Sequence, residues 1–420
     1  MEEIAQLSNA SASYDEIKAM GEAANPLEFP EPGVGRGVRV TARVYNPSLG
    51  EEASFPNVIY QIHETNANHA RRAYLIGRKL KKAIYGCVRS CTILRPRLKD
   101  GKYSLDSWET TSENGAVKII DWNVVRMNQG RHTEDPIKEV AAMQFCGING
   151  DHCNLMKCFD VLADDQYLYV FMPFCSKGEL FSFVDREGRF PEPLARFWFR
   201  QILNVSFAFE ISKLKKNQNF LIFFHLRILF CSWEKGLYHM QKIGICHRDL
   251  SLENLLVNEG NNCVIIDLGM CLRVPFGGDD GSVTDVSSGT LRRLITPQGQ
   301  CGKPNYIAPE IIQNSEAFDG FGIDVWAAGI ILFIMLVGLP PFEWAHDDDP
   351  RFKMITRGNL AAMLAQWNRT ISIDAMELLQ SMLQKDPRNR LSLMEVMDHR
   401  WVVNEDARPP RPPSNEEWRN

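Results

Sequence analysis

The chain has 420 residues, of which 45% are hydrophobic and 24% are charged, and its formal net charge is −5 at pH 7. This length exceeds what one small core needs and predicts two lobes or domains with tails, and the ordinary composition indicates a soluble globular enzyme. The weak negative charge gives no reason to expect nucleic acid or an anionic membrane surface as the main partner.

The cysteines and the apolar segments indicate in which cellular compartment the protein is expected. The eleven cysteines form no C-x-x-C pair, and the closest two, Cys87 and Cys91, lack the second pair that a zinc site needs. We therefore expect reduced thiols and a cytoplasmic location, with the nucleus as an open alternative. No secretory signal is expected from the acidic N-terminus. Val325–Val337 is apolar but runs thirteen residues, against the roughly 20 that a bilayer span needs, so we expect a buried helix and no membrane span.

The order of predicted elements divides the chain. Residues 1–70 are interpreted as a partly disordered N-terminal extension, with a strand suggested by alternation at Gly37–Tyr45. Residues 71–175 predict a small β-rich lobe, and residues 176–403 a larger, mainly helical lobe. The Pro/Arg-rich tail 404–420 is expected to be disordered. The predicted fold class is α+β. Strands are predicted at Tyr74–Leu80, Gly86–Leu94, Ala116–Asp121 and Gln166–Met172, and Asp135-Pro136 opens a helix over Pro136–Phe145.

The chemistry is concentrated in one stretch of the second lobe. Residues 247–254 read H-R-D-L-S-L-E-N, and Asp267-Leu268-Gly269 begins eighteen residues after Asp249, at the end of an apolar strand. Asp249 would accept the proton of a substrate hydroxyl, while Asn254 and Asp267 would supply oxygen ligands to Mg²⁺. A single tripeptide of this kind is most often a capped loop with solvated acids. The joint pattern is far rarer and favours catalysis.

These motifs resemble the eukaryotic protein kinase superfamily, of the serine/threonine type and with a calcium/calmodulin-dependent or polo-like flavour. Arg248 and Asp249 stand in its H-R-D-L-x-x-x-N loop, and D-L-G replaces D-F-G. The resemblance implies a bilobal fold, ATP and Mg²⁺ as cofactors, and protein substrates. It also implies that Lys118 grips the α- and β-phosphates and that Glu139 is its ion-pair partner. A lone Lys or Glu would ordinarily be a solvated surface charge, but order and spacing reverse that expectation here.

The resemblance further implies a set of nucleotide contacts. Met172 would lie behind the adenine, Glu179 would reach the ribose or a basic substrate residue, and three apolar residues would sandwich the ring, although such residues are equally at home in any core. The implied nucleotide-binding residues are Leu80, Lys81, Lys82, Gly86, Val88, Ala116, Lys118, Met172, Phe174, Cys175, Glu179 and Leu256. Beyond the pocket, Ala308-Pro309-Glu310 matches A-P-E with Arg390 as its salt-bridge partner, and Asp324 marks the buried helix that anchors the catalytic loop.

The glycine-rich loop departs from the family pattern. Of G-x-G-x-x-G-x-V only Gly86 and Val88 remain, and Lys81 and Ala83 stand where glycines let the backbone approach phosphates. Our hypothesis is that Lys81 or Lys82 replaces the lost contacts by charge. The upstream G-x-G-x-G at 33–37 is interpreted as a flexible turn. Because no strand–helix unit brackets it, a dinucleotide-dependent oxidoreductase is discarded.

The catalytic loop departs as well. The family usually carries Lys two residues after the catalytic Asp, where this chain has Ser251, and Thr shortly before A-P-E, where it has Lys303. Our hypothesis is that the two groups have exchanged positions, so that Lys303 supplies the positive charge beside Asp249 and Ser251 the hydroxyl. The alternative, of equal weight, is that Lys303 points to solvent.

An internal insert separates two halves of a predicted helix. In relatives one residue lies between the counterparts of Leu203 and Gly236, but here residues 204–235 intervene. Two explanations stay open. The segment is a retained intron, because removal of Val205–Lys235 is in frame and suits GT and AG codon ends. Alternatively, it is a genuine insert that loops out and docks its apolar residues on a neighbour.

Regulation and substrate choice follow from the resemblance. We call Asp267–Glu310 the activation loop. In the family, an arginine at the position of Arg248 often pairs with a phosphorylated residue of this loop, and Thr296 is our preferred phosphorylation site. Glu179 and Glu253 stand where relatives bind arginine before the target residue, so a basic substrate motif is expected. The alternative function is a weak or inactive pseudokinase that acts as a scaffold. Retention of all the expected polar residues argues against it: Lys118, Glu139, Asp249, Asn254 and Asp267. The sequence does not indicate an oligomeric state.

Overall fold

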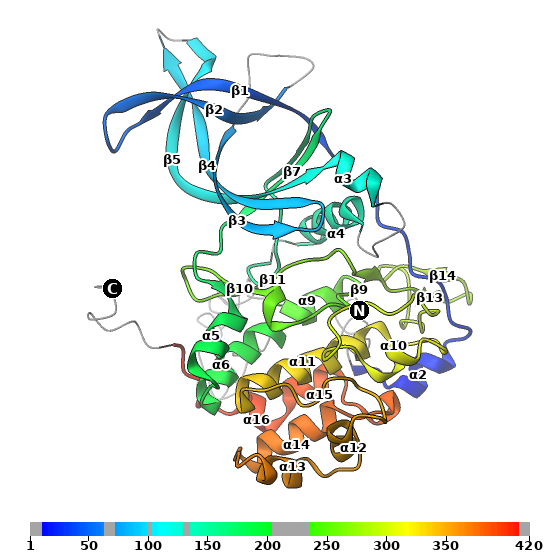
Figure 1. Ribbon diagram of the computed structural model, residues 1–420. Coiled ribbons are helices and arrows are strands. Elements are labelled where there is room, and N and C mark those ends of the chain that lie inside the picture. Colours follow the sequence, from blue (N-terminus) through cyan, green and yellow to red (C-terminus); the bar gives the residue numbers. More distant parts are fainter. Residues whose placement is uncertain are drawn as a thin grey trace, which may run out of the picture. The chain divides into compact units, whose positions relative to one another are not determined.

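The computed structural model describes residues 11–62, 72–99, 102–128, 135–150, 152–203 and 236–410. They fall into two compact units, which we call the β unit (Phe29–Asp151 and Met156–Cys175) and the helical unit (Met1–Glu28, His152–Leu155 and Ser176–Asn420). Strands dominate the first and helices the second, which confirms the predicted α+β class (Figure 1). The division differs from the predicted boundary at residue 70, since residues 29–62 belong to the β unit. The insert 204–235 and tail residues 411–420 lie outside the described residues.

The β unit is a closed barrel with strand order β1-β2-β3-β4-β5-β7-β6, and β1 closes it by pairing in parallel with β6 and with β5. Its strands are β1 (Gly35–Asn46), β2 (Glu51–Gln61), β3 (Ala73–Ala83), β4 (Gly86–Lys99), β5 (Lys102–Asp121), β6 (Asp160–Ala163) and β7 (Tyr167–Pro173). Two buried clusters fill the interior, one around Trp108 and the other around Val117 and Phe171. Each predicted strand of this region is confirmed.

The first two strands revise the interpretation of the N-terminal region. The strand predicted at Gly37–Tyr45 exists as part of β1, but β2 was not predicted. Pro56 lies in β2 where the register with β1 shifts, which is one of the few places a sheet accepts proline. The interpretation of the glycines at 33–37 as a flexible turn is wrong. A Cβ on Gly35 would lie 2.7 Å from Gln61 and 2.9 Å from Leu162, so this glycine permits close strand packing.

The described part of the β unit contains the helices α3 (Trp122–Met127) and α4 (Pro136–Ile148). The helix predicted from Asp135-Pro136 is confirmed as α4. Its N-cap Asp135 accepts hydrogen bonds from the amides of Ile137 and Lys138, which satisfies two of the free amides at the helix start. Glu139 in the first turn is thereby held on a capped, well-defined helix.

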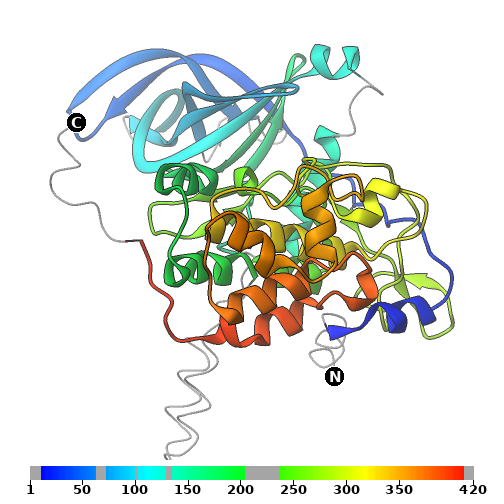
Figure 2. The same ribbon diagram turned by 60° about the horizontal axis from the view of Figure 1, so that its bottom comes forward.

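The helical unit is built around one apolar helix, α11 (Gly320–Val337), against which α6, α14 and α15 pack (Figure 2). The other helices are α2 (Tyr14–Ala19), α5 (Leu180–Glu187), α6 (Glu192–Leu203), α9 (Gly236–Lys242), α10 (Pro309–Gln313), α12 (Pro350–Thr356), α13 (Leu360–Gln366), α14 (Ile373–Met382), α15 (Leu393–Asp398) and α16 (Arg400–Val403). Among the described helices, α11 alone is long and apolar enough to cross a membrane, and nearly all of it is buried inside the protein.

Between its helices the helical unit contains short strands and 3₁₀ turns. They are β8 (Gly178–Glu179), β9 (Ile245–Cys246), β10 (Leu255–Val257), β11 (Cys263–Ile265), β12 (Leu272–Arg273), β13 (Phe276–Gly277), β14 (Val283–Thr284), η1 (Leu252–Asn254) and η2 (Pro387–Asn389). Strand β10 pairs with β11 and with β8, and β9 pairs with β12. These pairings hold the catalytic loop and the start of the activation loop in fixed positions.

The two ends that flank the insert meet. Gly236 has a left-handed backbone (φ +66°), and a Cβ there would lie 2.4 Å from the carbonyl oxygen of Ile202. The end of α6 and the start of α9 are therefore in direct backbone contact, although 32 residues separate Leu203 from Gly236 in the chain. This contact is what either explanation of the insert requires, because both need the two halves of the helix to stay in register.

Candidate active site

One face of the β unit gathers four of the implied nucleotide-binding residues. Val88 lies opposite Lys118 in the β4–β5 register, and Ala116 lies opposite Met172 in the β5–β7 register. Directly opposed residues of antiparallel strands project to the same face, as do residues two apart on one strand. Val88, Ala116, Lys118 and Met172 therefore share one face, whereas Val117, between them, points into the barrel core.

Lys118 and Glu139 form the predicted ion pair. The Lys118 Nζ atom is 2.5 Å from Glu139 Oε2, and the side chains are 16% and 12% exposed. A charge-assisted bond between such sheltered groups is stronger than one in water and fixes the position of the ammonium group. The ion pair links β5 to α4 and fixes the position of the Lys118 ammonium group.

The β3–β4 hairpin stands where the glycine-rich loop was expected. Ala83 pairs with Gly86, so residues 84–85 form a tight two-residue turn. A Cβ on Gly86 would lie 2.0 Å from the carbonyl oxygen of Ile119, so close packing against β5 requires this glycine whether or not a phosphate binds. Lys81 lies opposite Val88 and shares the face of Lys118, whereas Lys82 lies opposite Cys87 and projects to the other face. Of the two lysines, only Lys81 is placed for the hypothesised role.

A buried carboxylate holds the catalytic loop. Asp324 on α11 accepts hydrogen bonds from the His247 amide (2.6 Å) and the Arg248 amide (2.9 Å). Burial raises the pKa of Asp324 to about 6, although these two bonds and the nearby positive charges oppose the shift. Arg248 has the left-handed backbone (φ +67°) that costs free energy in a non-glycine residue. The two bonds to one fully buried carboxylate stabilise this strained turn, as the anchoring prediction required.

Asp249 and Asn254 are bonded to each other, and the chain just before Asp267 is bonded to Asn254. The Asn254 Nδ2 atom donates to Asp249 Oδ2 and to the Asp249 carbonyl oxygen, both at 2.8 Å. The amide of Ile266, the residue before Asp267, donates to the Asn254 carbonyl oxygen at 2.9 Å, so the backbone that leads into Asp267 is bonded to Asn254. Among the described residues the Asp267 carboxylate makes no hydrogen bond or ion pair. Because both Asn254 bonds use its nitrogen, its amide oxygen and the Asp267 carboxylate fit the oxygen ligands that Mg²⁺ prefers.

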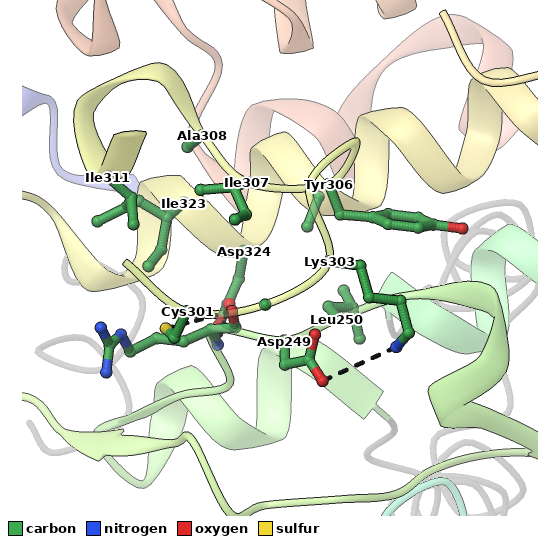
Figure 3. Close-up of a pocket in the computed structure, with 13 residues that line it drawn as sticks. Asp249, Leu250, Cys301, Lys303, Tyr306, Ile307, Ala308, Ile311, Ile323 and Asp324 are labelled. Atoms are coloured by element: carbon green, nitrogen blue, oxygen red, sulfur yellow. Dashed lines mark hydrogen bonds and ion pairs between the residues drawn. The ribbon is translucent and has the colours of Figure 1, made fainter. Parts of the chain in front are cut away.

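Lys303 lies beside the catalytic aspartate, with its side chain 34% exposed. Its Nζ atom donates to Ser251 Oγ at 2.6 Å. The same atom is 3.8 Å from Asp249 Oδ2 (Figure 3). Gly302, with φ +94°, permits this approach, because a Cβ there would lie 3.0 Å from the Arg248 carbonyl oxygen. Ser251 is completely buried. The geometry is the one that the exchange hypothesis predicts.

A family comparison decides the assignment of the fold. The family model described as "Protein kinase domain" matches residues 105–209 and 210–402. The chain belongs to the protein kinase family. The region matched by the family model begins after the β3–β4 hairpin of this kinase. The two matched segments meet between residues 209 and 210, inside the insert 204–235.

Curated relatives of the kinase carry the same assignment. The chain is 28% identical over 314 residues to the probable serine/threonine-protein kinase fhkD of Dictyostelium discoideum, covering 70% of this chain and 34% of the relative. It is 29% identical over 304 residues to the maternal embryonic leucine zipper kinase of Danio rerio (72% and 36%). It is 28% identical over 295 residues to the CBL-interacting serine/threonine-protein kinase 16 of Arabidopsis thaliana (70% and 52%). The chain thus spans about a third to a half of the length of these relatives.

The remaining implied nucleotide-binding residues are divided between the two units. Glu179 of β8 lies opposite Leu256 of β10 in the helical unit. In the β unit, Phe174 and Cys175 directly follow β7, Cys175 is buried, and Leu80 is exposed on β3. Sequence reasoning did not include Asp324 and Gly302 among the site residues. The signals were the D-V-W-A-A-G start of the apolar helix for the first, and for the second a glycine directly before Lys303.

Proposed function

We propose that this chain transfers the γ-phosphoryl group of ATP, with Mg²⁺, to serine or threonine hydroxyls of protein substrates. The observation that carries the proposal is the environment of Asp249. Asn254 and Lys303 hold its Oδ2 atom. Its Oδ1 atom is buried and has no hydrogen-bond partner among the described residues. A carboxylate with one oxygen fixed and the other available suits a group that accepts a hydroxyl proton.

The other groups take roles that match their chemistry. Lys118, fixed by Glu139, would bind nucleotide phosphate oxygens. Asn254 and Asp267 would hold Mg²⁺, which neutralises charge on the phosphates when bound. Lys303 would lower the energy of the negative charge that gathers near Asp249 during transfer. No covalent intermediate on the protein is needed, because positioning and charge stabilisation carry most of this reaction.

A basic substrate motif and a cytoplasmic location are part of the proposal. Glu253 is part of the catalytic loop 247–254, and its Oε2 atom is buried without a hydrogen-bond partner among the described residues. Such a carboxylate favours a cationic ligand, since an unpaired buried charge is costly. The cysteines among the described residues are free thiols, which supports a reducing compartment.

The proposal is tested with γ-labelled Mg-ATP and two serine peptides, one with arginine before the target and one acidic. We expect label on serine or threonine and faster labelling of the arginine peptide. Lys118→Ala should lower kcat/KM at least about 100-fold, because a fixed positive charge on the phosphates is lost. Lys79→Ala, which removes an exposed lysine of β3, is the matched control and should stay within about twofold. Binding of Mg-ATP by the wild type without any transfer would instead identify a binding module.

The exchange of Ser251 and Lys303 predicts a non-additive pair of substitutions. Ser251→Lys alone crowds two ammonium groups, and Lys303→Thr alone removes the positive charge near Asp249, so each should lower kcat by about 10- to 100-fold. The double variant restores one ammonium and one hydroxyl, and we expect it to regain at least about tenfold over either single variant. Lys353→Thr, at an exposed lysine, controls for loss of a charge. Losses that simply multiply in the double variant would refute the exchange.

A further inference from the structure

Residues Ala12–Glu28, which we call the N-terminal strap, lie along the activation loop. The Ala24 amide donates to the Leu294 carbonyl oxygen, and the Thr296 amide donates to the Ala24 carbonyl oxygen, both at 3.0 Å. Further along, the Leu27 amide donates to the Arg273 carbonyl oxygen at 3.0 Å. The strap therefore pairs with the loop as an added extended segment at both of these points.

Apolar side chains fasten the helix of the strap to the same loop. Ile17 of α2 is 1% exposed and forms a buried cluster with Ala12 and Leu294. A Cβ on Gly277 of the β13–β14 hairpin would lie 2.7 Å from Met20 Cε, so Met20 covers that glycine. Figures 1 and 2 both show α2 at the end of the helical unit where this hairpin lies. Burial of Ile17 supplies the non-directional part of the contact.

Polar contacts fix the register of the strap. The Thr296 hydroxyl donates to Asn25 Oδ1 at 2.6 Å. Arg292 forms a bidentate ion pair with Asp319 at 2.8 and 2.9 Å, and its guanidinium also donates to the Ala12 carbonyl oxygen at 3.4 Å. Because Asp319 is the N-cap of α11, the strap is connected through Arg292 to the central helix of the unit.

A side chain of the catalytic loop holds the same part of the activation loop. The Arg248 guanidinium donates to the carbonyl oxygens of Met270 (3.5 Å) and Gly299 (3.1 Å). These two residues bracket the stretch that the strap covers. Lys303 follows four residues after Gly299, so the stretch that the strap holds leads directly into the group beside Asp249.

The residues after the strap continue onto the helix that carries Glu139. In the β unit, Phe29 packs edge-on against Phe145 of α4, with ring centroids 5.8 Å apart. The Gly33 backbone exchanges two hydrogen bonds with the Gln144 side chain, at 2.8 and 2.7 Å. One continuous stretch of chain thus contacts the activation loop and then α4.

We propose that the N-terminal strap is a built-in activating ligand of the activation loop, which it holds in the conformation that brings Lys303 to Asp249. The inference rests on the proposed function. It also reassigns Thr296, our preferred phosphorylation site, as a strap contact. A phosphoryl group on its hydroxyl would displace Asn25 and carry a negative charge into this contact, and so release the strap.

The test compares Ile17→Asp with Ala19→Asp in the full chain. Both variants place the same new carboxylate on α2, but only Ile17 is buried against the loop. In Ile17→Asp, hydrogen exchange at the amides of Ala24, Leu27 and Thr296 should accelerate at least about tenfold, and peptide phosphorylation should fall by a similar factor. Ala19→Asp should change neither quantity. Unchanged exchange in the buried amides of α11 shows that the variant is folded.

The outcomes separate the strap from the catalytic proposal. Equal exchange rates in the wild type and Ile17→Asp would overturn the inference, as would accelerated exchange with unchanged or increased activity. Thr296→Glu should reproduce both changes of Ile17→Asp; a gain of activity would instead make Thr296 an activating site and overturn its reassignment. If the wild type transfers no phosphate, the proposed function fails and with it the activating role of the strap, while the exchange measurement still decides whether the strap orders the loop.

Discussion

Replacement of Asp249 by Asn is expected to lower kcat about a thousandfold with little change in fold. An amide cannot accept the hydroxyl proton that the carboxylate takes up, and positioned general bases contribute about 10²- to 10⁴-fold. The amide oxygen of the new Asn can still accept the Asn254 Nδ2 bond that Asp249 Oδ2 accepts at 2.8 Å. The loss should therefore be chemical and not structural. Initial rates at saturating Mg-ATP and peptide measure it.

The matched control for this substitution is Asp279→Asn in the same activation loop. It makes the same change of charge and shape at an exposed residue, and kcat should stay within about twofold. The melting temperatures of both variants should lie within about 2 °C of the wild type, because Asp249→Asn keeps the bond from Asn254 and gives up only a 3.8 Å ion pair with the partly exposed Lys303, and Asp279 is exposed. Retention of more than about a tenth of wild-type kcat by Asp249→Asn would contradict the role of Asp249 as the base.

Replacement of Arg390 by Ala is expected to cost about 3–5 kcal/mol of unfolding free energy, the range for breaking a buried ion pair. The two terminal nitrogens of Arg390, Nη1 and Nη2, donate to the Glu310 carboxylate at 2.7 and 3.0 Å. Nη1 also donates to the Gly322 carbonyl oxygen, and Nη2 to that of Gln384. The Arg390 side chain is 1% exposed and that of Glu310 13%. Its loss leaves a sheltered carboxylate without its cation, at the end of the activation loop.

The exposed pair two residues earlier provides the control for Arg390. Arg388 binds Asp386, and its side chain is 59% exposed, so Arg388→Ala should change the unfolding free energy far less than Arg390→Ala, because solvent screens an exposed pair. Denaturant unfolding of the three proteins measures both values. Equal losses in the two variants would show that the burial of the Glu310 pair is not what stabilises this part of the chain. Partial recovery in Glu310→Gln/Arg390→Met would support the stranded charge as the cause.

The catalytic groups could be predicted because local sequence carries them. Asp249, Asn254 and Asp267 lie within nineteen consecutive residues, on strands and turns whose pairings are short-range. The helix with Glu139 begins at an Asp-Pro start signal that the structure confirms. The position of Lys303 beside Asp249 was predicted by comparing Ser251 and Lys303 with the Lys and Thr that the family usually carries at these two positions. The chain keeps one ammonium group and one hydroxyl, with the two positions exchanged.

The rest of the fold was not predictable for a physical reason. Strand β2 contains Pro56, and its first half is exposed, so the sequence of β2 shows no alternating hydrophobic pattern. The strand forms because it pairs with β1. The strap depends on still longer-range pairing, since the Asn25 and Thr296 side chains that bond are 271 residues apart. No periodicity within residues 12–28 indicates what they pack against. The role of Gly86 was also hidden, because only the structure shows how close the Ile119 carbonyl oxygen lies.

Closure of the barrel by β1 has a consequence for how much of the chain can be handled alone. β1 pairs with β2 on one side and with β6 and β5 on the other. A fragment trimmed to the family-matched core at residue 105 would lose the first four strands together. The backbone amides and carbonyls of the strands left behind would then be unpaired along open margins, which invite intermolecular sheet growth. Protection of the sheet margins against aggregation thus depends partly on β1 and β2, two strands to which no nucleotide contact is assigned.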